Sequence, residues 1–310
     1  MQTLLKEQLE IFLPTYNRKK HLLRTLTQLT APESPVRSCS LTVLDNASTD
    51  GSSELIEEFA AKIPTIKHIR HAKNIGGNGN IARAFELAQK PYVWVVCDDD
   101  SFRWDAWPEI ENALFSNEYD ILLTRKDDLK GTSNLAKIVR QLTFLPAGIY
   151  RTANITGGVL MNALNNIPNM FPHLAVVCAV LNKKGRIFLP QGEIMDKCTF
   201  SDQSGDEWSV RGYDVYPHPF VGNMFWTVGF LNSLQMIEDK KLHAYILEHV
   251  GNHGFLGYIL GSFRKNYTRY HGNKLNIAFV KSGLTGWQRV KFLVARILLR
   301  MVTLFSRKRS

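Results

Sequence analysis

The chain has 310 residues, 45% of them hydrophobic and 21% charged, a composition that is typical of a globular protein and excludes a disordered or fibrous one. Its formal net charge of +10 is uneven, because residues 249–310 hold twelve of the 38 Lys and Arg and none of the 28 Asp and Glu. This asymmetry indicates that the C-terminal end meets an anionic surface, either a membrane or a nucleic acid.

Strands and helices alternate along the first 125 residues. Apolar runs predict strands, and apolar residues at helical spacing predict the helices between them. Strands are expected at about 10–14, 41–44, 66–69, 93–96 and 120–124, and helices at 21–29, 52–62, 81–88 and 107–115. Such alternation with short connections is typical of a doubly wound, mostly parallel α/β sheet.

The remaining chain is less regular. Residues 155–161 predict a loop entering a short helix, residues 171–181 a buried helix, and residues 185–190 a strand. The polar residues between 199 and 216 are interpreted as a mobile loop. The four cysteines, at positions 39, 97, 178 and 198, show no Cys-x-x-Cys spacing, so neither a zinc site nor a disulfide framework is indicated.

The most informative stretch is the apolar run Val93–Val96, which leads into Asp98, Asp99 and Asp100. Ligands of open α/β sheets bind beyond the carboxyl ends of the strands, where these three carboxylates are expected. Like charges packed so closely repel one another unless a cation or hydroxyl groups compensate. A divalent cation carrying phosphates fits this position, and a merely solvated acidic turn is the alternative.

The C-terminal stretch from Trp287 to Phe305 is apolar and is interrupted by Arg289, Arg296 and Arg300. A spanning helix would bury Arg296 and Arg300 at about 2.5–3.5 kcal/mol each, so we do not expect one. A basic amphipathic helix in the plane of a membrane lets these arginines reach the phosphate headgroups. A helix docked on the core of the protein itself is the alternative interpretation.

Four motifs together resemble the inverting glycosyltransferases of family 2. They are Pro14-Thr-Tyr-Asn17, Asp45-Asn-Ala-Ser-Thr-Asp-Gly51, Asn74-Ile-Gly76 and Asp98-Asp-Asp100, in this order and each after a predicted strand. The resemblance covers residues 9–125 well and 126–190 loosely. It implies a GT-A fold with a nucleotide-sugar-binding half at 1–125 and an acceptor-binding half at 126–248. The basic composition of residues 249–310 separately predicts a membrane-surface-associating segment there.

The resemblance also implies a donor site. The turn of Pro14, Thr15, Tyr16 and Asn17 is expected to bind the nucleotide, with Asp45 accepting a hydrogen bond from the base, commonly uracil. The loop with Asn74 and Gly76 would pass beside the nucleotide, since glycine permits close backbone approach. Asp98 would face the ribose, with Asp99 beside it, and Asp100 would bind Mn²⁺ or Mg²⁺ on the diphosphate.

The general base is where this sequence departs from the family. The family often places a carboxylate pair at the start of the helix that begins here near Phe171-Pro-His173, where no carboxylate stands. His173 is one candidate for the base, with a structural histidine as its alternative. Further candidates are Asp202, Asp206 and Glu207 on the predicted loop. His218, held between two prolines, is a candidate third metal ligand or a plain turn residue.

The predicted activity is metal-assisted, inverting transfer of a sugar from a nucleoside-diphosphate sugar, with UDP as the expected nucleotide. The expected acceptor is a lipid-linked glycan of cell-surface polysaccharide or lipopolysaccharide synthesis. Residues 1–10 show no secretory signal, so a cytoplasmic enzyme is expected, peripheral at the inner face of the cell membrane and bound to anionic lipid through residues 285–310.

Two other functions remain open from the sequence. A sugar-phosphate nucleotidyltransferase would also use such a sheet and a carboxylate-held metal, but it usually opens with a glycine-rich phosphate loop that residues 14–17 lack. A non-catalytic scaffold or nucleic-acid-binding protein would use the basic tail. Basic residues interleaved with a broad apolar face suit a bilayer better, so no nucleic-acid partner is expected.

Overall fold

The computed structural model describes residues 4–125, 134–196 and 229–250, and, near the C-terminus, 286–287, 289–294 and 297–298. Its centre is a seven-stranded sheet in the order β3-β2-β1-β4-β7-β6-β8. The strands are β1 (Leu9–Thr15), β2 (Ser40–Asp45), β3 (Ile66–Arg70), β4 (Tyr92–Val95), β6 (Ile121–Leu123), β7 (Gly148–Arg151) and β8 (Ile187–Phe188). Four neighbouring pairs are parallel, and only β7 runs antiparallel to both of its neighbours.

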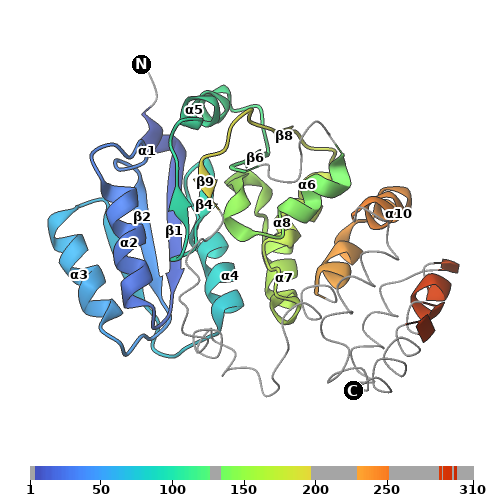
Figure 1. Ribbon diagram of the computed structural model, residues 1–310, viewed down its shortest axis with the longest axis horizontal. Helices are drawn as coiled ribbons and strands as arrows, with labels where there is room; N and C mark the ends of the chain where they lie inside the picture. Colours follow the sequence, from blue (N-terminus) through green and yellow to red (C-terminus); the bar gives the residue numbers. More distant parts are fainter. Residues whose placement is uncertain are drawn as a thin grey trace, which may run out of the picture.

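Helices cover both faces of this sheet (Figure 1). Helices α2 (Lys19–Thr30), α3 (Ser52–Lys62) and α5 (Trp107–Ser116) pack on one face, and α4 (Gly77–Leu87), α6 (Leu135–Gln141) and α8 (Leu174–Asn182) pack on the other. Successive strand residues point to opposite faces, so Tyr92 and Trp94 join the first core while Val93 and Val95 join the second. The predicted doubly wound arrangement is therefore confirmed, in a sheet that is mixed rather than wholly parallel.

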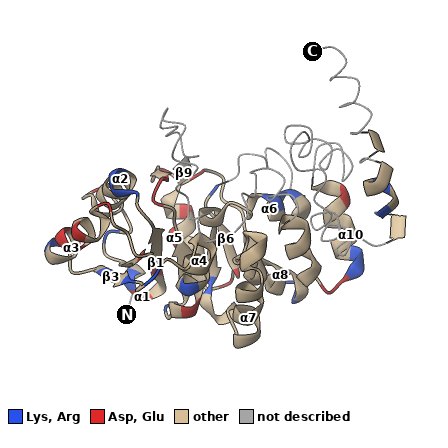
Figure 2. Cartoon of the chain, turned by 90° about the horizontal axis from the view of Figure 1, so that it is seen from below, with Lys and Arg blue, Asp and Glu red and all other residues tan. Residues whose placement is uncertain are grey.

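Several of the helices carry charged residues on their polar sides (Figure 2), whereas α8 is buried almost all round. In α2, for example, Leu22, Leu26 and Leu29 are buried, whereas Lys19 and Lys20 are exposed. This spacing of three to four residues places the leucines on one helical face. The remaining helices are α1 (Leu5–Gln8), α7 (Gly157–Asn165) and α10 (Lys240–His249), and 3-10 turns lie at 145–147, 152–154, 167–169 and 234–236.

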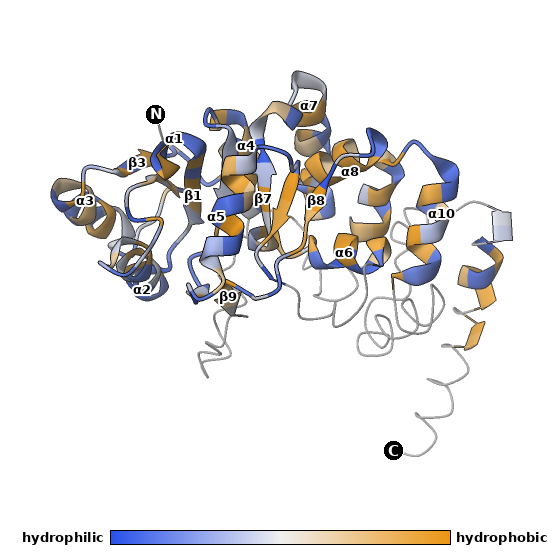
Figure 3. Ribbon diagram, turned by 90° about the horizontal axis from the view of Figure 1, so that it is seen from above, coloured by the Kyte–Doolittle hydropathy of each residue, from blue (hydrophilic) through white to orange (hydrophobic). Residues whose placement is uncertain are grey.

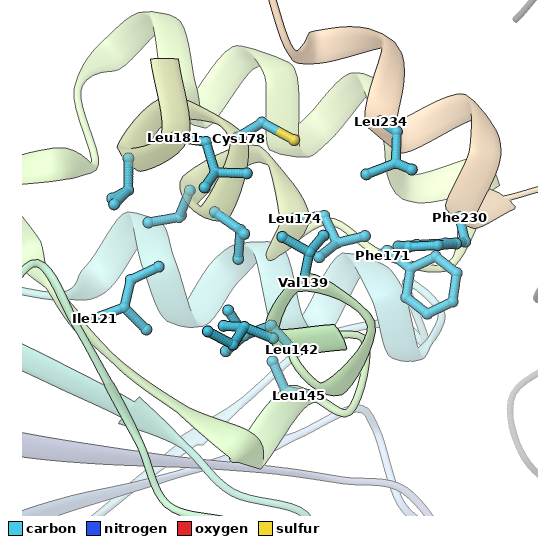
Figure 4. Packing of buried hydrophobic residues seen from close by; sticks show 14 of the residues in the cluster. Ile121, Val139, Leu142, Leu145, Phe171, Leu174, Cys178, Leu181, Phe230 and Leu234 are labelled. Carbon is cyan, nitrogen blue, oxygen red and sulfur yellow. The ribbon is translucent and has the colours of Figure 1, made fainter. Parts of the chain in front are cut away.

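The core on the α8 side joins distant parts of the sequence. Phe171 and Leu174, at the start of α8, lie against Phe230 and Leu234, which come after the gap in the described chain (Figure 4). The rings of Phe171 and Phe230 meet edge to face with centroids 6.4 Å apart. This packing fixes residues 229–250 against the same sheet that carries residues 9–125.

Two features of the fold differ from the expectation. The predicted loop at 74–80 is helical from Gly77 onward, because tertiary bonds hold it: Asn80 Nδ2 donates to the Leu44 carbonyl over 2.8 Å. The strand β7 was not predicted, and it enters the sheet between β4 and β6. A short antiparallel pair, β5 (Ser101–Phe102) with β9 (Met195–Asp196), lies just after the three aspartates.

The described residues between 286 and 298 are helical and lie beside α10 (Figure 1). Phe292 is buried in the α8-side core, and Lys291 Nζ pairs with Glu248 Oε1 at 2.7 Å. Trp287, Val290, Leu293, Val294, Ile297 and Leu298 stay exposed, and Figure 3 shows hydrophobic, orange ribbon along part of this segment. The segment thus packs on the protein with one side and exposes apolar residues on the other. Within the described chain no helix has the length and apolar character needed to cross a membrane.

Candidate active site

A pocket of about 220 Å³ opens at the carboxyl ends of β1 and β4. The turn after β1, the residue after β2, the first turn of α4 and the end of β4 all contribute to it, because parallel strands end at the same edge of a sheet. Its lining residues are Pro14, Thr15, Tyr16, Arg18, Asn46, Gly77, Asn80, Ile81, Val96, Cys97, Asp98, Asp99 and Leu145. The expected nucleotide turn and two of the three aspartates therefore meet in one cavity.

Asp98 is tied to the turn after β1. Thr15 Oγ1 donates to Asp98 Oδ2 over 2.7 Å, and Arg18 Nη1 lies 2.5 Å from Asp98 Oδ1. The same guanidinium reaches Asp99 Oδ2 through Nη2 at 3.1 Å. Burial raises the pKa of the Asp98 carboxyl, and the Arg18 charge acts in the opposite direction. The positive charge that the three carboxylates require is thus supplied in part by the chain itself.

Asp100 lies behind the pocket, fully buried. Its Oδ2 accepts a hydrogen bond of 2.8 Å from the Cys97 backbone, whereas its Oδ1 has no hydrogen-bond partner within the described residues. Burial raises the pKa of this carboxyl well above its usual range, and Asp99 and Asp98 add to the effect. A buried carboxylate oxygen without a partner is costly, so the donor set fits a divalent cation.

Asp100, Asp99 and Cys97 each offer one ligand atom, and these atoms lie within 4.8 Å of one another. Carboxylate oxygens suit Mg²⁺ and Mn²⁺, whereas a thiolate suits softer metals. Burial and the neighbouring carboxylates raise the pKa of the Cys97 thiol, so Asp99 and Asp100 are the stronger candidates for an oxygen-preferring ion. Asp100 is the metal ligand that the sequence predicts, and the structure adds Asp99 as a second candidate ligand.

Asp45 has a different environment from the one expected. It is fully buried and does not line the pocket. Its Oδ1 accepts from the Ser48 backbone at 2.8 Å, and its Oδ2 accepts from the Ser53 hydroxyl. Burial alone would raise its pKa, but these hydrogen bonds outweigh burial and lower it. Through these bonds Asp45 orders the loop after β2, and its neighbour Asn46 lines the cavity. The hydrogen bond from the base to Asp45 stays a prediction.

The Asn74–Gly76 loop is held beside the pocket by side-chain amides. Asn46 Nδ2 donates to Asn74 Oδ1 over 2.7 Å, and Asn46 Oδ1 accepts from the Ile75 backbone at 2.9 Å. Gly76 has φ +79°, a conformation that glycine adopts without strain, and its N–H donates to Asn74 Oδ1. The loop leads into the first turn of α4, where Gly77 and Asn80 line the cavity.

Asn17 plays a connecting role rather than a lining one. It adopts φ +50°, and its Oδ1 accepts from the Thr49 backbone at 2.7 Å. Its own N–H donates to Ser48 Oγ over 3.0 Å. Asn17 thus joins the loop after β1 to the loop after β2, and the cavity is lined by Pro14, Thr15 and Tyr16 without it.

The family profile described as "Glycosyl transferase family 2" matches residues 10–173, slightly more than half of the chain. The chain belongs to glycosyl transferase family 2. The matched residues include β1, β2, β4 and the whole pocket, so the family resemblance seen in the four motifs is confirmed. The match also decides against a sugar-phosphate nucleotidyltransferase.

Two characterised family members illustrate the range of sequence relatives. Abequosyltransferase RfbV of Salmonella typhimurium is 31% identical over 117 residues, which are 37% of this chain and 35% of that protein. The poly(ribitol-phosphate) β-N-acetylglucosaminyltransferase TarS of Staphylococcus aureus is 25% identical over 157 residues, 46% of this chain and 27% of TarS. The matched segments thus span about a third or less of these relatives.

The fold is also that of solved glycosyltransferases. S. aureus TarS 1–349 in complex with UDP-GlcNAc superposes with a TM-score of 0.60 at 17% identity, covering 89% of this chain and 79% of that one. The mannosyltransferase PcManGT of Pyrobaculum calidifontis, in complex with GDP-Man and Mn²⁺, gives a TM-score of 0.54 at 14% identity, covering 94% and 86%. At these identities the likeness extends to the fold alone.

His173, a candidate family base, lies in the core and not in the pocket. It is 2% exposed at the start of α8, and its Nε2 donates to the Leu142 carbonyl over 2.9 Å. Burial lowers the pKa of its imidazole to about 4. A buried imidazole with this pKa and a backbone partner is a structural residue, so the structure does not support His173 as the base.

The burial of His173 predicts a pH dependence of stability. The pKa of about 4 in the folded protein lies below the ordinary histidine pKa of 6.5. Between these two values the unfolded chain binds more protons than the folded one, so stability is lost as the pH falls through this range. We expect the free energy of unfolding to drop by roughly 2 kcal/mol between pH 7 and pH 5 from this residue. Urea unfolding of wild type and His173→Gln at both values measures it.

The exposed His249 provides the control, since His249→Gln should keep the wild-type pH dependence. An equally steep loss of stability in His173→Gln and in the wild type would show that His173 is not the group responsible.

The other candidate residues of the acceptor side, Asp202, Asp206, Glu207 and His218, lie outside the described residues. Their roles as base and third metal ligand stay predictions. Several pocket residues were not predicted as site residues, among them Arg18, Asn46 and Cys97. The need for a compensating charge beside three carboxylates was a signal for Arg18, which follows the Pro14–Asn17 turn directly in the sequence.

Proposed function

We propose that the chain transfers a sugar from a nucleoside-diphosphate sugar to a glycan acceptor. The observation that carries the proposal is the pocket at the ends of β1 and β4, where Asp98 is held by Thr15 and Arg18 and the buried Asp100 keeps one unpartnered oxygen. The TarS and PcManGT structures, which have the same fold, are complexes with UDP-GlcNAc and GDP-Man. UDP is the first nucleotide to test.

Each part of the pocket has a task in this reaction. Tyr16 and Pro14 offer apolar surface to the base, and the first turn of α4 presents backbone N–H groups where phosphates would lie. Asp99 and Asp100 would hold Mn²⁺ or Mg²⁺, which neutralises the charge that develops on the leaving diphosphate. Asp98 and Thr15 fix the end of β4 relative to β1, so the donor and the metal ligands keep one geometry.

For inversion, the acceptor hydroxyl attacks the anomeric carbon from the side opposite to the diphosphate, and the bond from that carbon to the phosphate oxygen breaks. A general base has to take the hydroxyl proton. Asp202, Asp206 and Glu207 are our candidates, and His173 is no longer one. This assignment predicts that alanine at the true base lowers kcat and leaves the affinity for the nucleotide nearly unchanged.

The activity is tested by incubating the protein with UDP-, GDP- and CDP-sugars and measuring release of the free nucleotide with and without Mn²⁺. Release of nucleotide from one donor class above background supports the proposal and names the nucleotide. Absence of turnover together with absence of nucleotide binding would favour the non-catalytic scaffold.

We further propose that the acceptor is lipid-linked and that the enzyme works at the inner face of the cell membrane. The C-terminal segment supports this, since Trp287, Val294 and Ile297 are exposed while Phe292 and Lys291 hold the segment to the protein. An exposed apolar face flanked by arginines fits the boundary of an anionic bilayer.

Replacing Trp287 and Ile297 with aspartate together should lower binding to phosphatidylglycerol vesicles at least about tenfold, because each burial of such a side chain contributes roughly 1.5–3 kcal/mol. Vesicle flotation measures this effect. Met161→Asp is the matched control, since Met161 is equally exposed on α7. Undiminished flotation of the double variant would contradict the membrane assignment.

A further inference from the structure

Arg18 occupies an unusual place among the groups of the pocket. Its guanidinium spans two different carboxylates, with Nη1 at 2.5 Å from Asp98 and Nη2 at 3.1 Å from Asp99. Its side chain is 17% exposed and lines the cavity. An ion pair that is shielded from water on most sides is only weakly screened, so Arg18 reduces the repulsion between Asp98 and Asp99. A second cation, Arg24, acts on Asp100 and donates to its backbone carbonyl over 3.3 Å.

The fold places Arg18 there for a simple reason. Strands β1 and β4 are parallel neighbours, so the turn after Thr15 and the aspartates after Val96 leave the same edge of the sheet. Asn17 at φ +50° turns the chain, and Arg18 is the residue at which α2 begins. From this position at the N-terminus of α2, the Arg18 guanidinium reaches the aspartates that follow β4.

The two carboxylates that Arg18 holds differ in what else they contact. Asp98 also accepts from Thr15 Oγ1, so it is retained when the guanidinium is gone. Asp99 is a member of the group with Asp100 and Cys97 whose ligand atoms lie within 4.8 Å of one another. A divalent cation in that group and the Arg18 guanidinium therefore compete for the same Asp99 carboxylate.

We propose that Arg18 is a built-in counter-cation of the aspartate cluster, which the metal displaces from Asp99 when the donor binds, and that the released arm of the guanidinium then binds the diphosphate. This inference rests on the proposed donor site. The planar fork of arginine matches two phosphate oxygens as well as it matches two carboxylates. In the free protein Arg18 thus offsets part of the negative charge of the aspartate cluster.

The proposal predicts effects of opposite sign on two ligands. Removing the charge in Arg18→Gln should strengthen binding of Mn²⁺ alone by about tenfold, because a neighbouring positive charge no longer opposes the metal. The same variant should weaken binding of UDP in saturating Mn²⁺ by about tenfold, because a charge-assisted contact to the diphosphate is lost. A purely structural role for Arg18 would weaken both.

The first quantity is measured by titrating Mn²⁺ and following the electron paramagnetic resonance signal of the free ion; the second is measured by calorimetry. Arg18→Lys keeps the charge, so its affinity for Mn²⁺ alone should stay within about twofold of wild type. Arg186→Gln is the matched control: it removes an arginine paired with Glu118, outside the residues that line the pocket.

Failure of the proposed function can be distinguished from failure of the inference about Arg18. If the wild type binds none of UDP, GDP or CDP, the proposed function falls, and this inference falls with it. If the wild type binds a nucleotide and Arg18→Gln shows unchanged or weaker binding of Mn²⁺ alone, the inference about Arg18 is wrong while the proposed function stands.

Discussion

Asp100→Asn is expected to abolish metal-dependent nucleotide binding at micromolar metal and to lower transferase activity about 100- to 1,000-fold. The reason is that a neutral amide replaces the buried carboxylate whose Oδ1 has no partner in the described chain, and metal stabilisation of a leaving group contributes several kcal/mol. Calorimetry of UDP with and without Mn²⁺ measures the binding, and nucleotide release measures the activity.

The amide oxygen of asparagine can still accept the 2.8 Å hydrogen bond from the Cys97 backbone, so the turn should keep its shape. Asp105→Asn serves as the matched control, because it makes the same change of charge at an exposed position five residues further on. Wild-type affinity for Mn²⁺ and UDP in Asp100→Asn would remove this residue from the metal site.

The largest loss of stability is expected from Trp94→Ala. Trp94 is fully buried in β4, the strand that carries the aspartates, and its ring packs against Phe102 and Trp107 at centroid distances of 5.6 and 6.4 Å. Its Nε1 donates to the Pro146 carbonyl over 2.9 Å. Truncation leaves a cavity in the core, while the Pro146 carbonyl keeps its second hydrogen bond, from Thr124 Oγ1, so unfolding should become easier by about 3–5 kcal/mol. Urea denaturation measures this loss.

Trp94→Phe retains much of the ring volume and should cost only about 1–2 kcal/mol. Trp287→Ala makes the same truncation at a 70% exposed position and should change stability by no more than about 0.5 kcal/mol. If Trp94→Ala and Trp287→Ala had equal effects, the central placement of β4 would be incorrect.

The sequence was sufficient to predict most of the α/β core. Strong apolar patterns mark these elements: continuous apolar runs mark the strands around Leu41, Ile66 and Val93, and helical spacing marks the helices around Leu26 and Ile56. Such patterns can be read from the sequence because they reflect only which face of an element is buried. The strand β7 was missed because Gly148–Arg151 is four residues long and its pairing with β4 and β6 is set by tertiary contacts. Short antiparallel insertions carry no comparable local signal.

The candidate site was predicted at the level of motifs rather than of individual roles. Pro14, Thr15, Tyr16, Asp98 and Asp99 meet in the pocket as expected. Asp45 and Asn17 proved to hold loops together, because their hydrogen bonds to Ser48, Ser53 and Thr49 come from packing that the motif does not encode.

His173 shows the limit of motif reasoning most clearly. Its position at the start of α8 matches the expected place of the base, but the burial of α8 on the sheet decides its environment. Whether a helix start faces a cavity or a core depends on the packing of distant segments, here α6 and residues 229–250. The apolar run at 171–181 did predict a buried helix, but the environment of its first residues is set by these distant segments.

The central claim is that the pocket at the carboxyl ends of β1 and β4 binds a nucleoside diphosphate together with a metal. Calorimetric titration of UDP, with GDP and CDP in parallel, tests it most directly when each is measured with and without Mn²⁺ on wild type and on Asp100→Asn. We predict saturable, Mn²⁺-dependent binding of one nucleotide by the wild type and its loss in Asp100→Asn. Failure of all three nucleotides to bind the wild type in the presence of Mn²⁺ would contradict the claim.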